Sequence, residues 1–521
     1  MSDTAPRIGK IVLRDFRFFP GNEVYTFDLG DDGKNLLLFG ENGCGKSSLF
    51  HALRLLLRES APKQAFAAYR NIFNPGEEGT IAVELTAGMP QDFKWEYGEP
   101  HPATTGDTAF LDLVRRVTFL DYKALLRTSL LHDDAEYVNL FSLLVETLLR
   151  DAELPDGRTV FQHWESVRRF RPPEPPPESD EDEEEFPTPE EQINAAAQRF
   201  MAQLDELLNV SAGGGRSLLA RANELLAKLT SDLEVRTEVG ALRVQEISHD
   251  PGHRPHAFIG ADVRLQAIYA GHVIEHPALC LNEARLTAIA LALYLAAAEA
   301  TTPRTGGQQT PRLLVLDDVL IGLDFANRLP VLRMLNEEFS DWQVILMTFD
   351  RVWFDLAREY TEHTGRWRYP TLRELPASPR KPGRPVVEAC ADLLSRAEAH
   401  LQAGDLMAAA VYIRAAFETR VKNVCRDEGI KVAYKPDPRD VKIDQLWEAI
   451  VERQKTRQAT GDVDFIDPGL MNDVEAVRSV VRNRLSHAGM PTLTSNEVKL
   501  ALDTVRRLQQ HNFKKSSRPA A

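Results

Sequence analysis

The chain has 521 residues and a formal net charge of −15, with 43% hydrophobic and 27% charged residues; this length exceeds one compact core, so we expect roughly two to four domains. Its four cysteines lie far apart and form no Cys-x-x-Cys pair, which argues against a disulfide scaffold and a zinc site and favours a reducing cytoplasm. No apolar run approaches the roughly 20 residues of a membrane span, and the first residues lack a signal-peptide pattern, so we expect a cytoplasmic protein without a membrane partner.

The N-terminal segment predicts strands, a glycine-rich loop and a helix. Apolar residues within 8–29 indicate a strand pair, and the run 35–39 indicates a buried strand. The segment Gly40-Glu41-Asn42-Gly43-Cys44-Gly45-Lys46-Ser47 follows, and a helix pattern extends over 48–57. This strand-loop-helix order predicts a phosphate-binding loop rather than an ordinary turn.

The residue types of this loop suit a nucleotide. Glycines let backbone N–H groups point at a polyphosphate, and the following helix offers its positive end. Lys46 would neutralise the β- and γ-phosphates of ATP, and the hydroxyl of Ser47 would bind Mg²⁺. The predicted nucleotide-binding residues of the loop are Gly40, Asn42, Gly43, Cys44, Gly45, Lys46, Ser47 and Ser48.

The middle of the chain predicts a helical insertion. Strands are expected at 79–85 and 119–123, and helices at 138–170, 190–208 and 217–233. Proline-rich residues 171–177 and acidic residues 178–185 predict an extended, solvated linker, which we favour over a nucleic-acid mimic that covers a basic site. The helices predict a short antiparallel arm, too short to tether DNA over long distances.

A second acidic motif follows a buried strand. Residues 312–316 lead into Asp317 and Asp318, which is the Walker B pattern of apolar residues ending in two carboxylates. Asp317 would hold Mg²⁺ directly or through water, and Asp318 would orient or deprotonate the attacking water. The alternative is a strand that ends in polar turn residues.

The order of these motifs resembles the ABC-type ATPase heads of the SMC/RecF class over roughly 8–370. The resemblance is carried by the two motifs above, by Leu281-Asn282-Glu283-Ala284-Arg285 before an apolar helix, and by Gly322-Leu323-Asp324. In that family two heads sandwich two ATP molecules, which implies a homodimer. By position, Asn282 and Glu283 begin the signature helix, where Asn282 suits an N-cap, and Asp324 belongs to the D-loop.

The chain departs from the family pattern at three places. The signature lacks the usual glycines after its first polar residue, and Phe349 stands where the family often has a histidine that senses the γ-phosphate. No glutamine lies near 121–123, where the Gln-loop counterpart is expected. The resemblance therefore implies ATP binding more strongly than it implies a rate of hydrolysis.

The C-terminal part predicts only helices after a proline-rich, basic linker at 376–385. Helices are expected at about 388–402, 405–428, 443–455, 470–486 and 495–511. The stretches 395–418 and 481–489 resemble a HEPN domain, a helical bundle that in many members is a metal-independent ribonuclease. Arg482, Asn483 and His487 match its R-N-x-x-x-H form. RNA supplies the 2′-OH nucleophile, so His487 would move protons and Arg482 would stabilise the charged transition state.

Geometry leaves the HEPN assignment open. Asn483 and His487 share a helix face, but Arg482 and His487 lie about 140° apart on an ideal helix. Either the helix frays near Gly489 or the site forms across a dimer. The alternatives are an inert docking or dimerising bundle, and for Arg414 and Glu418 a surface ion pair rather than a second catalytic contribution.

Taken together, the sequence predicts an α/β P-loop NTPase head of ABC/SMC type with a short helical arm, followed by an all-α bundle. The expected divisions are 1–137 and 251–375 for the two head lobes, 138–250 for the arm and 386–521 for the bundle. The leading hypothesis is an ATPase that gates a ribonuclease acting on RNA, including tRNA, as a toxin triggered by phage.

Two rival functions remain at this point. One is a regulatory ATPase beside a separately encoded nuclease or toxin, as in Septu-like or retron-associated defence. The other is a RecF-like repair factor on DNA, which leaves the C-terminal bundle unexplained. The mildly basic C-terminal part is weak evidence for RNA or DNA binding.

Overall fold

A computed structural model describes most of the chain. The described residues are 6–58, 60–73, 75–76, 78–86, 92–129, 137–154, 156–173, 187–210, 217–301, 311–375, 383–388, 393–431, 442–482 and 493–513. The chain forms two compact units, Met1–Ala389 and Cys390–Ala521. Each unit is described by itself.

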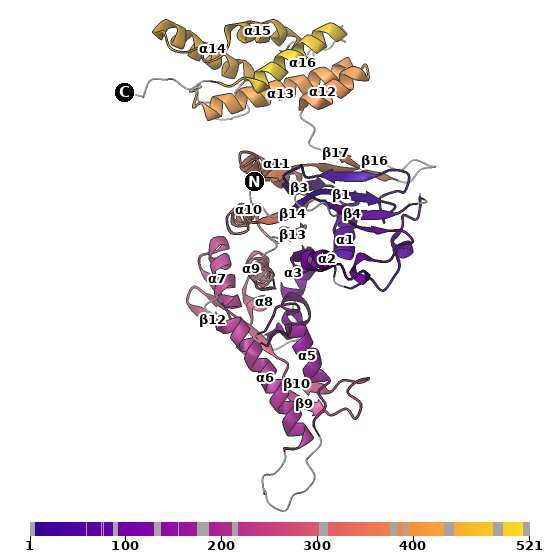
Figure 1. The fold of residues 1–521 in the computed structure, drawn as a ribbon. Coiled ribbons are helices and arrows are strands. Elements are labelled where there is room, and N and C mark those ends of the chain that lie inside the picture. Colours follow the sequence, from indigo (N-terminus) through magenta and orange to yellow (C-terminus); the bar gives the residue numbers. More distant parts are fainter. Residues whose placement is uncertain are drawn as a thin grey trace, which may run out of the picture. The chain divides into compact units, whose positions relative to one another are not determined.

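The central sheet of the first unit is built mainly from parallel strands. Its order is β17-β16-β3-β14-β13-β6, and β15 also pairs with β3 (Figure 1). The parallel core comprises β3 (Asn35–Gly40), β14 (Trp342–Thr348), β13 (Arg312–Asp317) and β6 (Val117–Asp121). Every residue of β3 and β14 is buried, as in a sheet covered on both faces. The carboxyl ends of these strands meet at one edge, which is where α/β sheets place ligand sites.

Alternate residues of the central strands face two hydrophobic cores. Leu36 and Leu38 pack with α1 (Lys46–Leu56) and an antiparallel sheet, whereas Leu37 and Phe39 pack with helices on the other face. The antiparallel sheet runs β2 (Tyr25–Asp28), β1 (Ile8–Arg14), β4 (Thr80–Leu85) and β5 (Asp92–Glu96). The expected α/β class of the first unit is thus confirmed.

Several short elements lie between α1 and the arm, before and after strands β4, β5 and β6. They are the 3₁₀ turns Phe66–Tyr69 and Pro102–Thr104, α2 (Thr108–Val114), α3 (Tyr122–Ser129), β7 (Val138–Asn139), α4 (Phe141–Leu143) and the π-helical turn Leu144–Leu148. The helix expected over 138–170 is therefore broken. A bridge between Glu153 and Thr159 precedes α5 (Val160–Arg168), which Thr159 caps.

The arm region contains strands that the sequence pattern did not predict. Its helices are α6 (Pro189–Asn209) and α7 (Leu218–Leu229), which pack on each other. The strands are β8 (Leu233–Val239), β9 (Arg243–Glu246), β10 (Ala257–Ile259), β11 (Val263–Tyr269) and β12 (His272–Ile274), followed by α8 (Pro277–Cys280). The expectation of helix up to residue 233 is wrong at its end, because β8 begins there and pairs along its length with β11.

Three helices cover the side of the sheet that carries Leu37 and Phe39. They are α9 (Glu283–Thr301), α10 (Phe325–Glu338) and α11 (Arg351–Glu362). In the described part of the chain, α9 is the helix long and apolar enough to cross a membrane, but most of it is buried inside the protein. Burial is continuous from Thr287 to Ala298, which confirms the expected buried core helix.

The last two residues of the segment expected as a linker, Arg384 and Pro385, belong to the central sheet. After β15 (Trp367–Arg368) and β16 (Thr371–Leu375), β17 covers Arg384–Glu388 and pairs antiparallel with β16. The expected start of the C-terminal domain at 386 therefore falls inside the head. Pro385 misled the sequence interpretation, although an outermost strand such as β17 tolerates a proline.

The second unit contains helices that share one hydrophobic core. They are α12 (Leu393–Gln402), α13 (Leu406–Asp427), α14 (Ile443–Thr460), α15 (Pro468–Arg482) and α16 (Ser495–Gln510). Trp447 and Phe417 lie in this core, and the centroids of their rings are 5.7 Å apart. The five helical segments were predicted, but α12 begins at 393 rather than 388.

A charged cluster ties α7 to α9 and α10. The Arg221 guanidinium donates to both carboxylate oxygens of Glu299, at 2.6 and 2.9 Å, and to Glu338 at 3.0 Å. Lys228 also pairs with Glu338, at 2.8 Å. These pairs raise the pKa of Arg221 above its usual range.

We expect Arg221→Ala to destabilise the first unit by about 2 kcal/mol, because the half-buried carboxylate of Glu299 loses both hydrogen bonds from Arg221 and Glu338 loses one. Urea unfolding followed by tryptophan fluorescence measures the loss. The matched control is Arg199→Ala on the exposed face of α6, where helix propensity changes equally. Equal losses in the two variants would show that the cluster adds nothing.

Candidate functional site

The glycine-rich loop needs its glycines for backbone reasons. Gly43 and Gly45 adopt φ values of +90° and +114°, which side chains disfavour. A Cβ added to Gly40 would lie 2.5 Å from the Cys44 sulfur. The chain thus turns tightly from β3 into α1, whose first residue is Lys46. This is the backbone shape that the phosphate-loop prediction requires.

The Lys46 side chain is buried inside this turn. Its Nζ donates to the carbonyl oxygens of Gly40 at 2.6 Å and Glu41 at 3.4 Å. It also lies 3.7 Å from Oδ2 of Asp318 and 5.9 Å from the centre of the Phe349 ring. The ammonium group is therefore fixed where the loop and the end of β13 meet, beside a carboxylate.

Asp317 and Ser47 form the second contact between the loop and β13. Ser47 Oγ donates to Asp317 Oδ2 at 3.2 Å, and Asp317 Oδ1 is buried without a hydrogen-bond partner. Burial, followed by the charge of Asp318, raises the pKa of Asp317 to about 6. A hydroxyl beside an unsatisfied carboxylate oxygen fits Mg²⁺, which prefers oxygen ligands. When bound there, Mg²⁺ would neutralise phosphate charge; Ser47 and Asp317 would hold it.

Asp318 is held in an unusual backbone conformation. Its φ is +53°, its N–H donates to Met347 O at 3.1 Å, and its Oδ1 accepts from the Phe349 N–H at 3.0 Å. Burial raises the pKa of its carboxyl group. A carboxylate fixed in this way can orient a water molecule and accept its proton. The strained backbone costs about 1–2 kcal/mol, which the surrounding bonds offset.

The neighbouring strand β6 and helix α1 add two residues to which the sequence interpretation gave no role. Asp121, the last residue of β6, lies opposite Asp317 in the sheet register. Its Oδ1 accepts from Ala124 N at 2.7 Å, and Arg54 on α1 lies 3.8 Å from its Oδ2. An acidic side chain thus stands where a Gln-loop counterpart was expected. The position of Asp121 at the end of a predicted strand was a signal in the sequence. Its pairing with Arg54 could be recognised only from the tertiary structure.

The predicted signature residues lie at a separate hollow. Asn282 Oδ1 accepts from the Arg285 N–H at 3.0 Å, so Asn282 caps α9 as expected. Asn282 and Glu283 are exposed, as is Asp324 before α10. The described residues that line the hollow are Leu229, Thr230, Asp232, Asn282, Ala284, Arg285, Ala288, Leu323, Asp324, Asn327 and Val331. The phosphate loop contributes none of them.

Arg285 contributes a cation to this hollow, which the sequence interpretation did not assign; Asp232 and Asp324 also line it. Arg285 Nη2 donates to Tyr269 OH at 3.0 Å and to Asp232 at 3.3 Å. Its guanidinium lies 4.4 Å from the centre of the Tyr269 ring. The signature helix is thereby tied to β11 and to the residue before β8.

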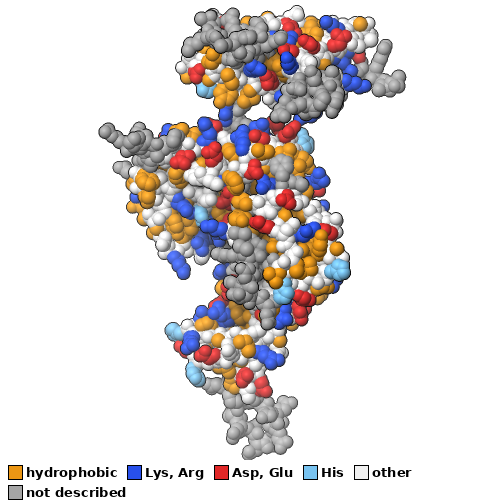
Figure 2. Space-filling view, turned by 180° about the vertical axis from the view of Figure 1, so that it is seen from behind, with side chains coloured by type: hydrophobic (Ala, Val, Ile, Leu, Met, Phe, Trp, Pro, Cys, Tyr) orange, Lys and Arg blue, Asp and Glu red, His pale blue; other side chains and the backbone are white. Residues whose placement is uncertain are grey.

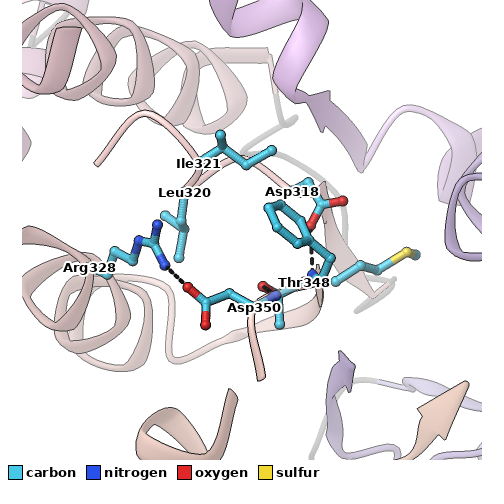
Figure 3. A pocket seen from close by; sticks show the side chains of 8 residues that line it. Asp318, Leu320, Ile321, Arg328, Thr348 and Asp350 are labelled. Carbon is cyan, nitrogen blue, oxygen red and sulfur yellow. Dashed lines mark hydrogen bonds and ion pairs between the residues drawn. The ribbon is translucent and has the colours of Figure 1, made fainter. Parts of the chain in front are cut away.

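The predicted D-loop packs directly on α9. A Cβ on Gly322 would lie 2.4 Å from Thr287 Oγ1 and 3.4 Å from Glu283 Oε1, so only glycine allows this approach. Beyond it, Arg328 on α10 pairs with Asp350 at 2.6 Å across a small pocket (Figure 3). Asp318, Leu320 and Ile321 line the same pocket. Phe349, which replaces the expected histidine, is 38% exposed there.

The predicted ribonuclease residues are not brought together in the described part of the second unit. Arg482 is the last residue of α15, and nothing is described of its side chain. Asn483 and His487 lie outside the described residues. Arg414 and Glu418 form an ion pair at 2.9 Å on the surface of α13. On the face drawn in Figure 2, acidic and basic side chains are interspersed over both units.

A family model described as an AAA domain matches residues 10–88, which contain most of β1, the phosphate loop and α1. Residues 10–88 are therefore similar to part of an AAA ATPase domain, for which ATP is the implied nucleotide. None of the curated proteins matches the sequence.

Solved structures of SMC heads resemble the chain at low identity. An SmcHead bound to the C-winged helix domain of ScpA is 13% identical with a TM-score of 0.39, over 74% of this chain and 98% of that one. An Smc head from Pyrococcus furiosus, bound to the C-terminal domain of ScpA, is 14% identical with a TM-score of 0.39. This match covers 74% of this chain and 97% of that one. The SMC head from Thermotoga maritima is 11% identical with a TM-score of 0.32, and the match covers 73% of this chain and 98% of that one. At these TM-scores the likeness carries no argument about function.

We expect Asp317→Asn to stabilise the metal-free protein and to abolish ATP hydrolysis that requires Mg²⁺. Because the pKa of Asp317 is raised from 3.8 to about 6 in the fold, its charged form destabilises the fold above pH 6. The gain should be on the order of 1–3 kcal/mol at pH 8 and should fade as the pH drops from about 6 to about 4.

Thermal unfolding in EDTA at both ends of this pH range measures the gain, and a steady-state assay measures hydrolysis. Asp341→Asn, at an exposed pair with Arg312, is the control. A gain that persists below pH 4, or none at pH 8, would contradict the assigned cause.

Proposed function

We propose that the chain is an ATP-hydrolysing head of the SMC/RecF type that pairs with a second copy of itself. The main observation is that the predicted site residues lie at two separate places. One group meets at one edge of the sheet and comprises Lys46, Ser47, Asp317 and Asp318. Asn282 and Asp324 instead line a hollow to which the phosphate loop contributes no residue. A nucleotide site assembled from one copy of each half accounts for both.

The residues at the sheet edge have distinct roles in this proposal. Lys46 binds the β- and γ-phosphates, Ser47 and Asp317 hold Mg²⁺, and Asp318 orients the attacking water and takes its proton. The hydroxyl of Ser47 is exposed enough to reach a ligand, while Asp317 is buried beside it. Hydrolysis therefore depends on contacts already made between α1 and β13.

Pairing of heads follows from the chemistry of the second hollow. Asn282 is an exposed amide at the start of α9, and amide and backbone N–H groups suit a phosphate. Arg285 adds a cation next to it. With Asp324 on the rim, this surface would contact the γ-phosphate bound by the other head.

We also propose that the second unit is a metal-independent ribonuclease of HEPN type, gated by the ATPase in defence against phage. Its support is the sequence motif of Arg482, Asn483 and His487 together with the all-helical unit around one core. The substrate class is RNA, because the 2′-OH provides the nucleophile that the motif itself lacks.

We expect two inactive variants to restore hydrolysis when mixed. Lys46→Ala loses ATP binding, and Asn282→Asp keeps the helix cap but places a negative charge against the partner's phosphate. A mixed dimer retains one intact site of two, so an equal mixture should recover about a quarter of the wild-type rate. Steady-state ATPase assays on the separate and mixed proteins measure this.

The control is ATP binding by Asn282→Asp alone, which should match the wild type because its phosphate loop is intact. If the mixture hydrolyses no more ATP than the two proteins do separately, the shared site is wrong. Asp318→Asn should bind ATP, keep only a small residual rate of hydrolysis and accumulate as dimers in light scattering.

We expect ATP-dependent cleavage of total RNA by the wild type, and loss of cleavage in Arg482→Ala and His487→Ala. Arg507→Ala, at an exposed pair with Asp473, should cleave normally. Undiminished cleavage by both motif variants contradicts the ribonuclease. A co-purifying nuclease without intrinsic cleavage favours a regulatory ATPase, and salt-sensitive, ATP-dependent DNA binding favours a repair factor.

A further inference from the structure

The pocket in Figure 3 holds an ion pair for which the roles above give no use. Arg328 on α10 and Asp350 before α11 face each other across it, with Nη1 donating to Asp350 Oδ2 at 2.6 Å. The Arg328 side chain is only 16% exposed. Charged groups this shielded from water are costly unless their geometry is good, so the pair has a defined position.

Arg328 makes a second bond that reaches the D-loop. Its Nε donates to the carbonyl oxygen of Leu323 at 2.9 Å. Because a guanidinium is planar and its donors are fixed relative to one another, both bonds hold at once only in one arrangement. Arg328 therefore sets the distance between the D-loop and the start of α11.

Asp350 passes this constraint to the end of β14. Its Oδ1 accepts from Trp353 N at 3.0 Å, which caps α11, and its own N–H donates to Thr348 Oγ1 at 3.1 Å. Phe349, which lies between Thr348 and Asp350 in the sequence, donates its N–H to Asp318 Oδ1 at 3.0 Å. The Asp318 carboxylate thus accepts a backbone hydrogen bond from a segment that Asp350 holds in place.

We propose that Arg328 is a positioning residue for hydrolysis: through Asp350 and the Phe349 N–H it sets the orientation of the Asp318 carboxylate, and it couples that orientation to the D-loop. This inference rests on the proposed function, in which Asp318 acts on the attacking water. A displaced carboxylate slows the chemical step, whereas ATP held by Lys46 and Ser47 is unaffected.

The Arg328→Gln and Asp350→Asn variants test the coupling. Asparagine keeps an oxygen that can cap α11, so Asp350→Asn removes the charge and spares the helix start. Each variant should lower kcat about tenfold or more and change the Kd for ATP by less than about threefold. The double variant should be no slower than the slower single variant, because both break the same link.

Two further proteins separate positioning from general stabilisation. In the Asp318→Asn background, Arg328→Gln should leave the residual rate unchanged, because the carboxylate that it positions is absent. Arg328→Lys should recover part of the lost kcat, since an ammonium can pair with Asp350 but cannot reproduce the fork to Leu323. Arg312→Gln, at an exposed pair on the opposite end of β13, is the matched control and should keep the wild-type kcat.

The outcomes distinguish this inference from the proposed function. A wild type that binds ATP and does not hydrolyse it overturns the proposed function. An active wild type with equally active Arg328→Gln overturns only the inference. The inference is also overturned if Arg328→Gln raises the Kd for ATP by the same factor by which it lowers kcat. It is likewise overturned if Arg328→Gln lowers the rate further in the Asp318→Asn background.

Discussion

The hydrogen bond from Ser47 to Asp317 is the contact on which the rest of the head depends. The two residues follow β3 and end β13, and β14 lies between those strands. The bond therefore exists only if three parallel strands keep their register and α1 leaves the loop at the right angle. It also brings a carboxylate into a site where burial opposes its charge. Burying the charged Asp317 carboxylate destabilises the fold at this edge, and a bound cation would offset that loss.

Much of this edge could be predicted from the sequence because its chemistry lies in short contiguous motifs. The glycines of the loop, Lys46 and the two aspartates each follow an apolar run that forms a buried strand. The apolar pattern of α9 was equally clear. What these motifs share is local: the residues that define the pattern are also the residues that act.

Residues whose role depends on pairing could not be predicted in the same way. The strand β8 carries charged residues at alternate positions and follows a helix closely, so its partner β11 decides its structure. β17 contains a proline that local rules read as a linker. Arg54, Arg285 and Arg328 are ordinary surface-type residues in the sequence, and their partners lie far away along the chain. Only the tertiary fold gives them a position.

The left-handed backbone of Asp318 limits which residues this position accepts. Aspartate and asparagine visit that conformation more readily than longer side chains do, and glycine visits it freely. Of the two carboxylate residues, aspartate is therefore the one that the local backbone favours. Replacing this aspartate with asparagine keeps a side chain that tolerates the left-handed backbone, and it removes the carboxylate that would act as the base. Under the proposed function, this one substitution would remove hydrolysis while the fold and the binding of the nucleotide remain.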